Sequence, residues 1–183
     1  MKKPEIERRF ILDEVPVLTK PEQKYEFAII SQFYSEDGFR YREVYKTESR
    51  FSSGWREITW FKTKKETIEG STFSVMEDES QITEEEYKLA TKDKTLPQIH
   101  KFRYTYTEDG LKFEIDELYS ARLIILEIEL DSEDQEITIP DWISYQIIAE
   151  ITGVKTLSNR SIALTLKERE NERHINGKSQ GEI

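Results

Sequence analysis

The sequence predicts a mainly antiparallel β protein with a few helices, of the α+β class. Eight stretches show the alternation, or the aromatic and β-branched residues, that are typical of strands. Asp-Gly turns join two neighbouring pairs of these stretches. Charged residues also recur along the stretches at a spacing of two, which places them on one face of each strand. We therefore expect the 183 residues to form one domain built on a sheet.

The expected strands follow one another along most of the chain. They span residues 4–12, 24–35, 39–48, 55–65, 72–79, 99–107, 111–118 and 122–130. The sequences Ser-Glu-Asp-Gly at 35–38 and Thr-Glu-Asp-Gly at 107–110 predict hairpin turns. Asp tolerates the left-handed backbone conformation, and Gly adopts a positive φ at little steric cost.

Two helices are expected between or after these strands. Thr83 and Glu86 have the spacing of a capping box, which predicts a helix over residues 83–93. Pro140 can occupy the first turn of a second helix over residues 141–151.

A third helix is expected near the C-terminus, from about Ser158 to Arg169. Residues 170–183 have almost no apolar content, so burial cannot compensate for the entropy lost on ordering them. We therefore expect a single domain over residues 1–169 and a flexible tail after it.

Composition narrows the classes of function. A net charge of −10 argues against nucleic acid or an anionic membrane as a partner, but allows a small enclosed basic site for a phosphorylated ligand. The absence of cysteine excludes disulfides and a thiolate nucleophile, and with two histidines a metal would need oxygen ligands. The N-terminal residues are charged, and no apolar run approaches ~20 residues, so we expect a soluble cytoplasmic protein.

The charges at a spacing of two form blocks of one sign. The acidic pairs are Glu5 and Glu7, Glu77 and Glu79, Glu114 and Asp116, and Glu127 and Glu129; the basic pairs are Arg40 and Arg42, Lys62 and Lys64, and Lys101 and Arg103. An ordinary one-sided sheet also alternates apolar and polar residues, but its solvent face mixes uncharged polar residues with charges. We therefore favour a barrel that holds these charges inside and is covered outside by the helices.

Such an interior suits a metal ion together with a polyanion. Crowded carboxylates raise one another's pKa unless cations compensate them. Glu-x-Glu pairs supply the hard oxygen ligands that Mg²⁺ and Mn²⁺ prefer, and guanidinium groups bind phosphate oxygens at two points. A metal, several basic side chains and a polyanion are the usual components of phosphoryl transfer.

The order of these pairs resembles the CYTH family, also called the triphosphate tunnel metalloenzymes. The resemblance covers about residues 4–165 and includes the stretches IPDWISYQIIAEIT and LSN after the last acidic strand. It implies a closed eight-stranded β-barrel tunnel with a charged interior and peripheral helices, which binds triphosphates with a divalent metal.

The resemblance also implies roles for individual residues. The implied metal ligands are Glu5, Glu7, Glu127 and Glu129, with Glu77, Glu79, Glu114 and Asp116 as candidates around a second metal. The implied phosphate-binding residues are Arg9, Arg40, Arg42, Lys62, Lys64, Lys101, Arg103, Lys155 and Asn159, and the implied catalytic residues are Glu5, Glu7, Arg9 and Lys64. A bulge would instead turn Lys65 inward. Arg9 stands where the family usually has Lys; arginine can contact a phosphate but cannot deprotonate, so its role in proton transfer is open.

The favoured function is hydrolysis of a triphosphate with Mg²⁺ or Mn²⁺. Inorganic tripolyphosphate is favoured over thiamine or nucleoside triphosphates, because nothing in the expected interior is shaped for an organic group. One alternative is an adenylate cyclase, an activity that also occurs in the family. Its members carry a His-Phe pair before the first acidic pair, whereas here Met-Lys-Lys-Pro precedes Glu5.

Two further alternatives stay open, a non-catalytic triphosphate or polyphosphate binder and an acidic β domain that only makes protein contacts. We expect a small-molecule triphosphate as the partner, no nucleic acid and no membrane, and either a monomer or a homodimer.

Overall fold

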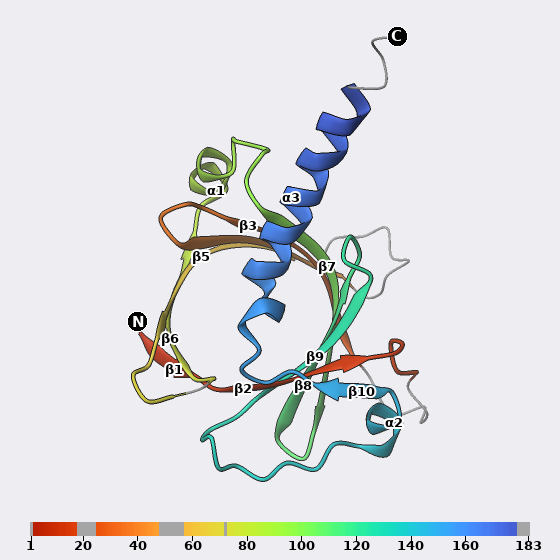
Figure 1. Ribbon diagram of the computed structural model, residues 1–183. Helices are drawn as coiled ribbons and strands as arrows, with labels where there is room; N and C mark the ends of the chain where they lie inside the picture. Colours follow the sequence, from red (N-terminus) through yellow and green to blue (C-terminus); the bar gives the residue numbers. More distant parts are fainter. Residues whose placement is uncertain (1, 18–24, 48–56, 72, 179–183) are drawn as a thin grey trace.

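The computed structural model describes residues 2–17, 25–47, 57–71 and 73–178. They form one barrel-like antiparallel sheet with helices on its outside and at one end (Figure 1). Its strands are β1 (Lys3–Glu5), β2 (Glu7–Leu12), β3 (Glu26–Tyr34), β4 (Phe39–Thr47), β5 (Glu57–Thr67), β6 (Val75–Ile82), β7 (Gln98–Glu108), β8 (Leu111–Leu118), β9 (Leu123–Glu129) and β10 (Ile147–Glu150). They are hydrogen-bonded in the order β1-β6-β5-β4-β3-β7-β8-β9-β2-β10. The expected mainly antiparallel β architecture is confirmed.

The strand expected over residues 4–12 forms as two strands, β1 and β2, which complete the ring of strands. It is interrupted at Ile6, and its two parts pair on opposite sides: β1 places Lys3 opposite Glu77 of β6, and β2 places Glu7 opposite Glu129 of β9. The hydrogen-bonded sheet therefore has ten strands and two ends, at β1 and β10, where we expected a closed ring of eight. The covalent chain through Ile6 bridges the remaining gap.

The strand boundaries agree with the expected ranges to within a few residues. Expected strand residues 24, 48, 55, 56 and 72 lie outside the described residues. The two Asp-Gly turns form as expected: Gly38 and Gly110 have φ values of 92° and 78°, and Asp109 has a φ of 51°. These positive values are the reason why the turns need Gly and Asp.

Helix α1 (Glu84–Ala90) confirms the capping box. The Glu86 backbone N–H donates to Thr83 Oγ1 at 3.2 Å, and the Thr83 N–H donates to the Glu86 carboxylate at 2.8 Å. The buried ring of Tyr87 meets Phe33 edge-on and fixes this helix against the outside of the barrel.

The expected helix over residues 141–151 is wrong beyond its first turn. Helix α2 (Asp141–Ser144) is short, and the chain then enters strand β10. β10 pairs with β2, and the flanking backbone adds a hydrogen bond from Ile151 N to Arg9 O at 2.8 Å. The open edge of β2 supplies backbone partners to a β-branched Ile-Ile pair, which local helix propensity does not take into account.

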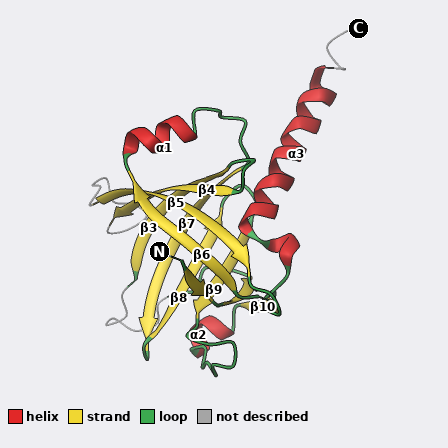
Figure 2. Ribbon diagram, turned by 90° about the vertical axis from the view of Figure 1, so that its left-hand side faces the viewer, coloured by secondary structure: helices red, strands yellow, loops and turns green. Residues whose placement is uncertain are grey.

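Helix α3 (Asn159–Lys178) follows a short 3₁₀ turn, η1 (Lys155–Leu157), and is longer than expected. Its first turns pack on the barrel through Ile162 and Ala163. Beyond Lys167 it projects away from the barrel with its side chains exposed through Ile175 (Figure 2). The segment expected to be a tail is therefore helical as far as Lys178. None of the helices in the described ranges is both long and apolar enough to cross a membrane.

Two apolar clusters hold the barrel and its coverings together. One lies on the outer face, where Phe10, Phe113 and Leu126 pack against Ile143 of α2. The other lies inside the barrel at the end covered by α3, because Ile99 and Ile125 share the strand faces of the inward charges and contact Ile162. The interior is thus apolar at the α3 end and charged beyond it.

Leu126→Ala tests the outer cluster. Leu126 is fully buried, so its truncation is expected to lower the free energy of unfolding by about 2–5 kcal/mol, as for other core leucines. Urea denaturation of the full chain measures this change. The control is Ile148→Ala on β10, where the side chain is 62% exposed, and equal losses in the two variants would contradict the assignment.

Candidate functional site

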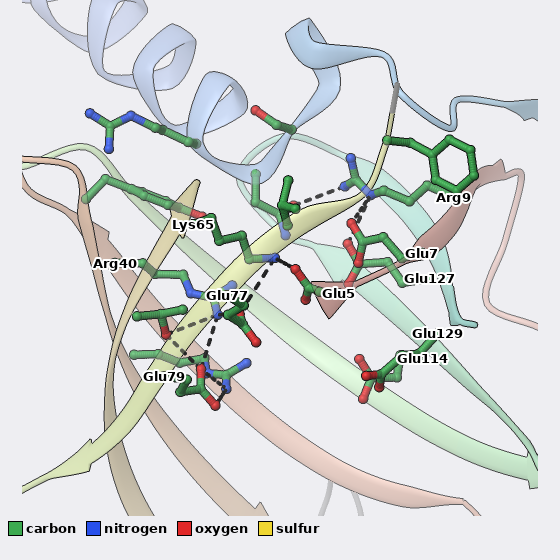
Figure 3. A pocket seen from close by; sticks show the side chains of 18 of the residues that line it. Glu5, Glu7, Arg9, Arg40, Lys65, Glu77, Glu79, Glu114, Glu127 and Glu129 are labelled. Carbon is green, nitrogen blue, oxygen red and sulfur yellow. Dashed lines mark hydrogen bonds and ion pairs between the residues drawn. The ribbon is translucent and has the colours of Figure 1, made fainter. Parts of the chain in front are cut away.

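The inward-facing charges line a cavity of about 610 Å³ inside the barrel (Figure 3). Within the described ranges, its nine basic side chains are Lys3, Arg9, Arg40, Arg42, Lys65, Lys101, Arg103, Lys112 and Arg160, and its seven acidic ones are Glu5, Glu7, Glu77, Glu79, Glu114, Glu127 and Glu129. Cations are therefore in excess in this cavity, although the whole chain carries a net charge of −10. A local excess of positive charge suits a polyanionic ligand.

One wall of the cavity is acidic, and strand register forces its carboxylates together. Glu7 lies opposite Glu129 on β2 and β9, and Glu127 lies opposite Glu114 on β9 and β8. Figure 3 shows Glu7 beside Glu127, and Glu114 beside Glu129. Like charges directly across a strand pair are destabilising, so this wall requires cations near it.

Arg103 of β7 supplies one of these cations. Its guanidinium donates to both Asp116 oxygens at 2.6 Å, to Glu127 Oε2 at 2.8 Å and to Glu114. Lys101 pairs with the same Asp116. Asp116, a candidate around a second metal, is fully buried, does not line the cavity and pairs with both basic side chains.

The opposite wall is basic, with its own acidic partners. Arg40 Nη2 donates to Glu77 at 3.1 Å and to Glu79 at 3.3 Å, and Arg42 Nη2 donates to Glu79 at 2.9 Å. Thr63 also donates to Glu79, at 2.7 Å. Glu77 and Glu79, candidates for a second metal, are thus held by arginines in this arrangement.

Arg9 lies between the acidic wall and the start of α3, and only 6% of its surface is exposed. Its Nε donates to Glu127 at 3.1 Å, its Nη1 donates to the Leu157 carbonyl at 2.9 Å, and its Nη2 donates to Asn159 at 3.4 Å. Arg9 and Asn159 both line the cavity, as expected for phosphate-binding residues.

Comparisons with known proteins place this arrangement in a fold. Neither the family models nor the curated proteins contain a match. Among solved structures, one described as the hypothetical protein NE1496 is 25% identical, with a TM-score of 0.53 over 87% of this chain and 97% of that chain. Another, described as the inorganic triphosphatase NE1496, is 22% identical, with a TM-score of 0.53 over 87% of this chain and 94% of that chain. This chain has the CYTH-type triphosphate tunnel fold. A more distant match, PH1819 from Pyrococcus horikoshii, has a TM-score of 0.45, 17% identity, and covers 71% of this chain and 80% of that one.

Within the tunnel fold, the structure corrects the predicted lysines of β5. Lys62 and Lys64 face away from the cavity, with their ammonium groups 3.9 and 5.2 Å from the centre of the Phe39 ring. Thr63 and Lys65 face inward, because Thr63 lies opposite Arg40 in an uninterrupted register. Lys65 is therefore the lysine of this stretch that faces the cavity. We expected that a bulge would be needed to turn it inward, but the register between β4 and β5 is uninterrupted.

The cavity lining differs from the predicted one in two further ways: one predicted residue lies outside it, and three residues that sequence reasoning missed belong to it. Lys155 is exposed and does not line the cavity, in contrast to its predicted phosphate contact. Lys3, Lys112 and Arg160 do line it. Lys112 has the same spacing of two from Glu114 that identified the other charges, so the pattern contained its signal.

Burial and neighbouring charges shift the pKa values of the tunnel carboxylates in opposite directions. Burial, followed by repulsion from Glu127 and Glu5, raises the pKa of Glu7 to about 7. Burial opposes ionisation of Glu127 as well, but Lys101, Arg9 and Arg103 together hold its pKa well below the usual value. Burial and the nearby Arg40 lower the pKa of Arg42 to about 10, so it stays charged at neutral pH.

The acidic wall has the donor chemistry of a divalent metal site. Glu5, Glu7, Glu127 and Glu129 offer only carboxylate oxygens, and a cation would remove the repulsion that raises the pKa of Glu7. In the parts of the chain that are described, no three of these groups already surround one point. Lysine and arginine side chains hold them instead: Lys65 pairs with Glu5, and Lys3 and Lys112 pair with Glu129 at 3.5 and 3.4 Å.

Asp116→Ala tests the buried anchor of the basic side chains. Removing the shared counter-charge of Lys101 and Arg103 is expected to lower the free energy of unfolding by about 3–5 kcal/mol, because a buried cation is left unpaired. Urea denaturation compares this variant with Asp131→Ala, whose side chain is exposed. A loss no larger than that of the control would contradict the anchoring role.

Glu7 gives the metal-free protein a defined pH dependence. Its raised pKa means that the folded state binds more protons than the unfolded state between about pH 4.5 and pH 7, so stability falls as pH rises through that window. Thermal unfolding in EDTA is expected to show a steeper fall in Tm from pH 5 to pH 7.5 for the wild type than for Glu7→Gln. Parallel Tm profiles would disprove the assignment.

Proposed function

We propose that this protein hydrolyses a triphosphate inside its tunnel, with Mg²⁺ or Mn²⁺ as the metal and inorganic tripolyphosphate as the favoured substrate. The observation that carries the proposal is one cavity in which an acidic wall faces an excess of cations. The solved structure described as an inorganic triphosphatase shares the fold and supports the same reaction class.

The two walls have separate tasks in this reaction. Glu5, Glu7, Glu127 and Glu129 would hold the metal, which supplies Lewis-acid polarisation of a phosphoryl oxygen. Arg40, Arg42, Lys65 and Arg103 bind the non-bridging phosphate oxygens and neutralise the charge that develops on the leaving group. Water attacks a terminal phosphorus atom, the anhydride P–O bond breaks, and orthophosphate and pyrophosphate are released.

An inorganic substrate is favoured by the nature of the cavity lining. Its aromatic residues within the described ranges are Tyr34 and Phe73, and neither Trp60 nor Trp142 reaches it. Trp60 donates to Glu43, and Trp142 packs edge-on against Tyr106. Neither of these two tryptophans therefore offers a stacking surface for a nucleobase, and we favour an inorganic substrate over a nucleoside triphosphate or the cyclase alternative.

A non-catalytic triphosphate binder is the second candidate, and Arg9 favours it. Its guanidinium is already held by Glu127, Leu157 and Asn159, so it is poorly placed to take part in proton transfer. Binding of tripolyphosphate without turnover would select this candidate.

A phosphate-release assay over tripolyphosphate, thiamine triphosphate and ATP, each with Mg²⁺ and Mn²⁺, tests the proposal. We expect release from tripolyphosphate and a loss of about 100-fold in kcat for Lys65→Ala, as for removal of one transition-state donor. Lys64→Ala is the matched control, because the neighbouring lysine faces away from the cavity and its loss is expected to leave kcat unchanged.

Absence of phosphate release from every substrate would overturn hydrolysis. Equal losses in Lys64→Ala and Lys65→Ala would overturn the assignment of the inward lysine.

A further inference from the structure

Arg160 is the one basic side chain of the cavity lining that has no ion pair among the described residues. Each of the other eight basic side chains in the cavity makes an ion pair with a glutamate or aspartate in the described parts of the chain. Within those same parts, Arg160 has only one polar partner, the Ser35 carbonyl, which its Nη2 reaches at 3.4 Å. A half-buried guanidinium with no carboxylate beside it is available to an anion.

The fold places this free charge at the covered end of the cavity. Arg160 lies in the first turn of α3, which begins in front of the opening of the ring of strands (Figure 1). The Ser35 carbonyl that it contacts follows Tyr34, and Tyr34 lies opposite Arg40 on β4. Beneath it, Tyr34 packs in the same apolar cluster as Ile162 of α3. This end of the tunnel is therefore covered, and Arg160 is part of its cover.

Three arginines follow one another away from that end. Arg160 reaches the Ser35 carbonyl at the covered end, and Arg40 lies opposite the adjacent Tyr34 on β4. Arg42 follows two residues further along β4, and its Nη2 and that of Arg40 both donate to Glu79 Oε2. Arg40 and Arg42 are tied to Glu77 and Glu79, so their positions are fixed before any ligand binds. The arrangement suits a linear chain of phosphoryl groups with one free end towards α3.

We infer that Arg160 binds the terminal phosphoryl group of the polyphosphate and makes the tunnel selective for chains of at least three phosphoryl groups with an unesterified end at α3. This inference rests on the proposed function and extends it to the orientation of the ligand. On this inference, a diphosphate held by Arg40 and Arg42, whose Nη2 atoms share Glu79 Oε2, leaves Arg160 without a phosphoryl group, whereas a triphosphate supplies one. An ester group at the α3 end would meet the apolar cluster and the helix in place of a phosphate-binding guanidinium.

Calorimetric titration of the full chain with tripolyphosphate and with pyrophosphate, in EDTA to prevent turnover, tests the inference. Arg160→Gln is expected to weaken tripolyphosphate binding about tenfold, since a charge-assisted pair is lost, and to leave pyrophosphate binding nearly unchanged. Arg160→Lys keeps the charge but loses the two-point contact, so it is expected to fall between the wild type and Arg160→Gln. In the Mg²⁺ assay, Arg160→Gln is expected to raise KM for tripolyphosphate and to change kcat little.

Arg169→Gln is the matched control, because it removes the same charge from an exposed position on the same helix. Equal effects of the two glutamine variants, or equal weakening of both ligands by Arg160→Gln, would overturn the inference. A wild-type protein that releases phosphate while Arg160→Gln behaves identically would overturn the inference alone. A wild-type protein that neither binds nor hydrolyses tripolyphosphate would overturn the proposed function as well.

Discussion

The contact of Arg103 with three carboxylates is the interaction on which the rest of the tunnel depends. Asp116, Glu114 and Glu127 come from two neighbouring strands and would repel one another without it. With the guanidinium in place, Glu127 ionises, Lys101 keeps its partner and the acidic wall keeps its register. Polar side chains can then fill the interior of a barrel where most proteins of this size place hydrophobic residues.

This charge compensation also explains why some charged side chains of the site are held in place while others remain able to bind a ligand. Cations such as Arg40 and Arg103 are fixed by glutamates, so they keep their positions whether or not a ligand is present. Glu7 is the least compensated member of the acidic wall, and Arg160 is the least compensated cation in the described cavity lining. The first suits a metal and the second suits a phosphate, and they lie on different elements, β2 and α3.

Alternation in the sequence predicted which face most charges occupy, because a period of two is a local property of a strand. It failed at β5, where Lys62, Lys64 and Lys65 put cations on both faces, and only the pairing of Thr63 with Arg40 decides which face is inside. Alternation also does not show whether an inward side chain reaches the cavity. Asp116 was therefore predicted as a candidate ligand although it is fully buried and does not line the cavity. The helix expected beyond Ser144 failed for a related reason, since the competing partner, β2, is distant in sequence.

The break at Ile6 has a consequence for how the chain reaches this fold. The two strands on either side of this break pair far along the chain, β1 with β6 and β2 with β9. Such long-range pairing is slow, because a long loop must close before any contact compensates for the entropy lost. Strands β3, β4, β5 and β6 can form as successive hairpins while β2 remains without its partner. We therefore expect the β1–β6 and β2–β9 pairings, which bring Glu5 and Glu7 to the acidic wall, to form after the hairpins. Until they form, the sheet edges of β6 and β9 are exposed to pairing with other chains.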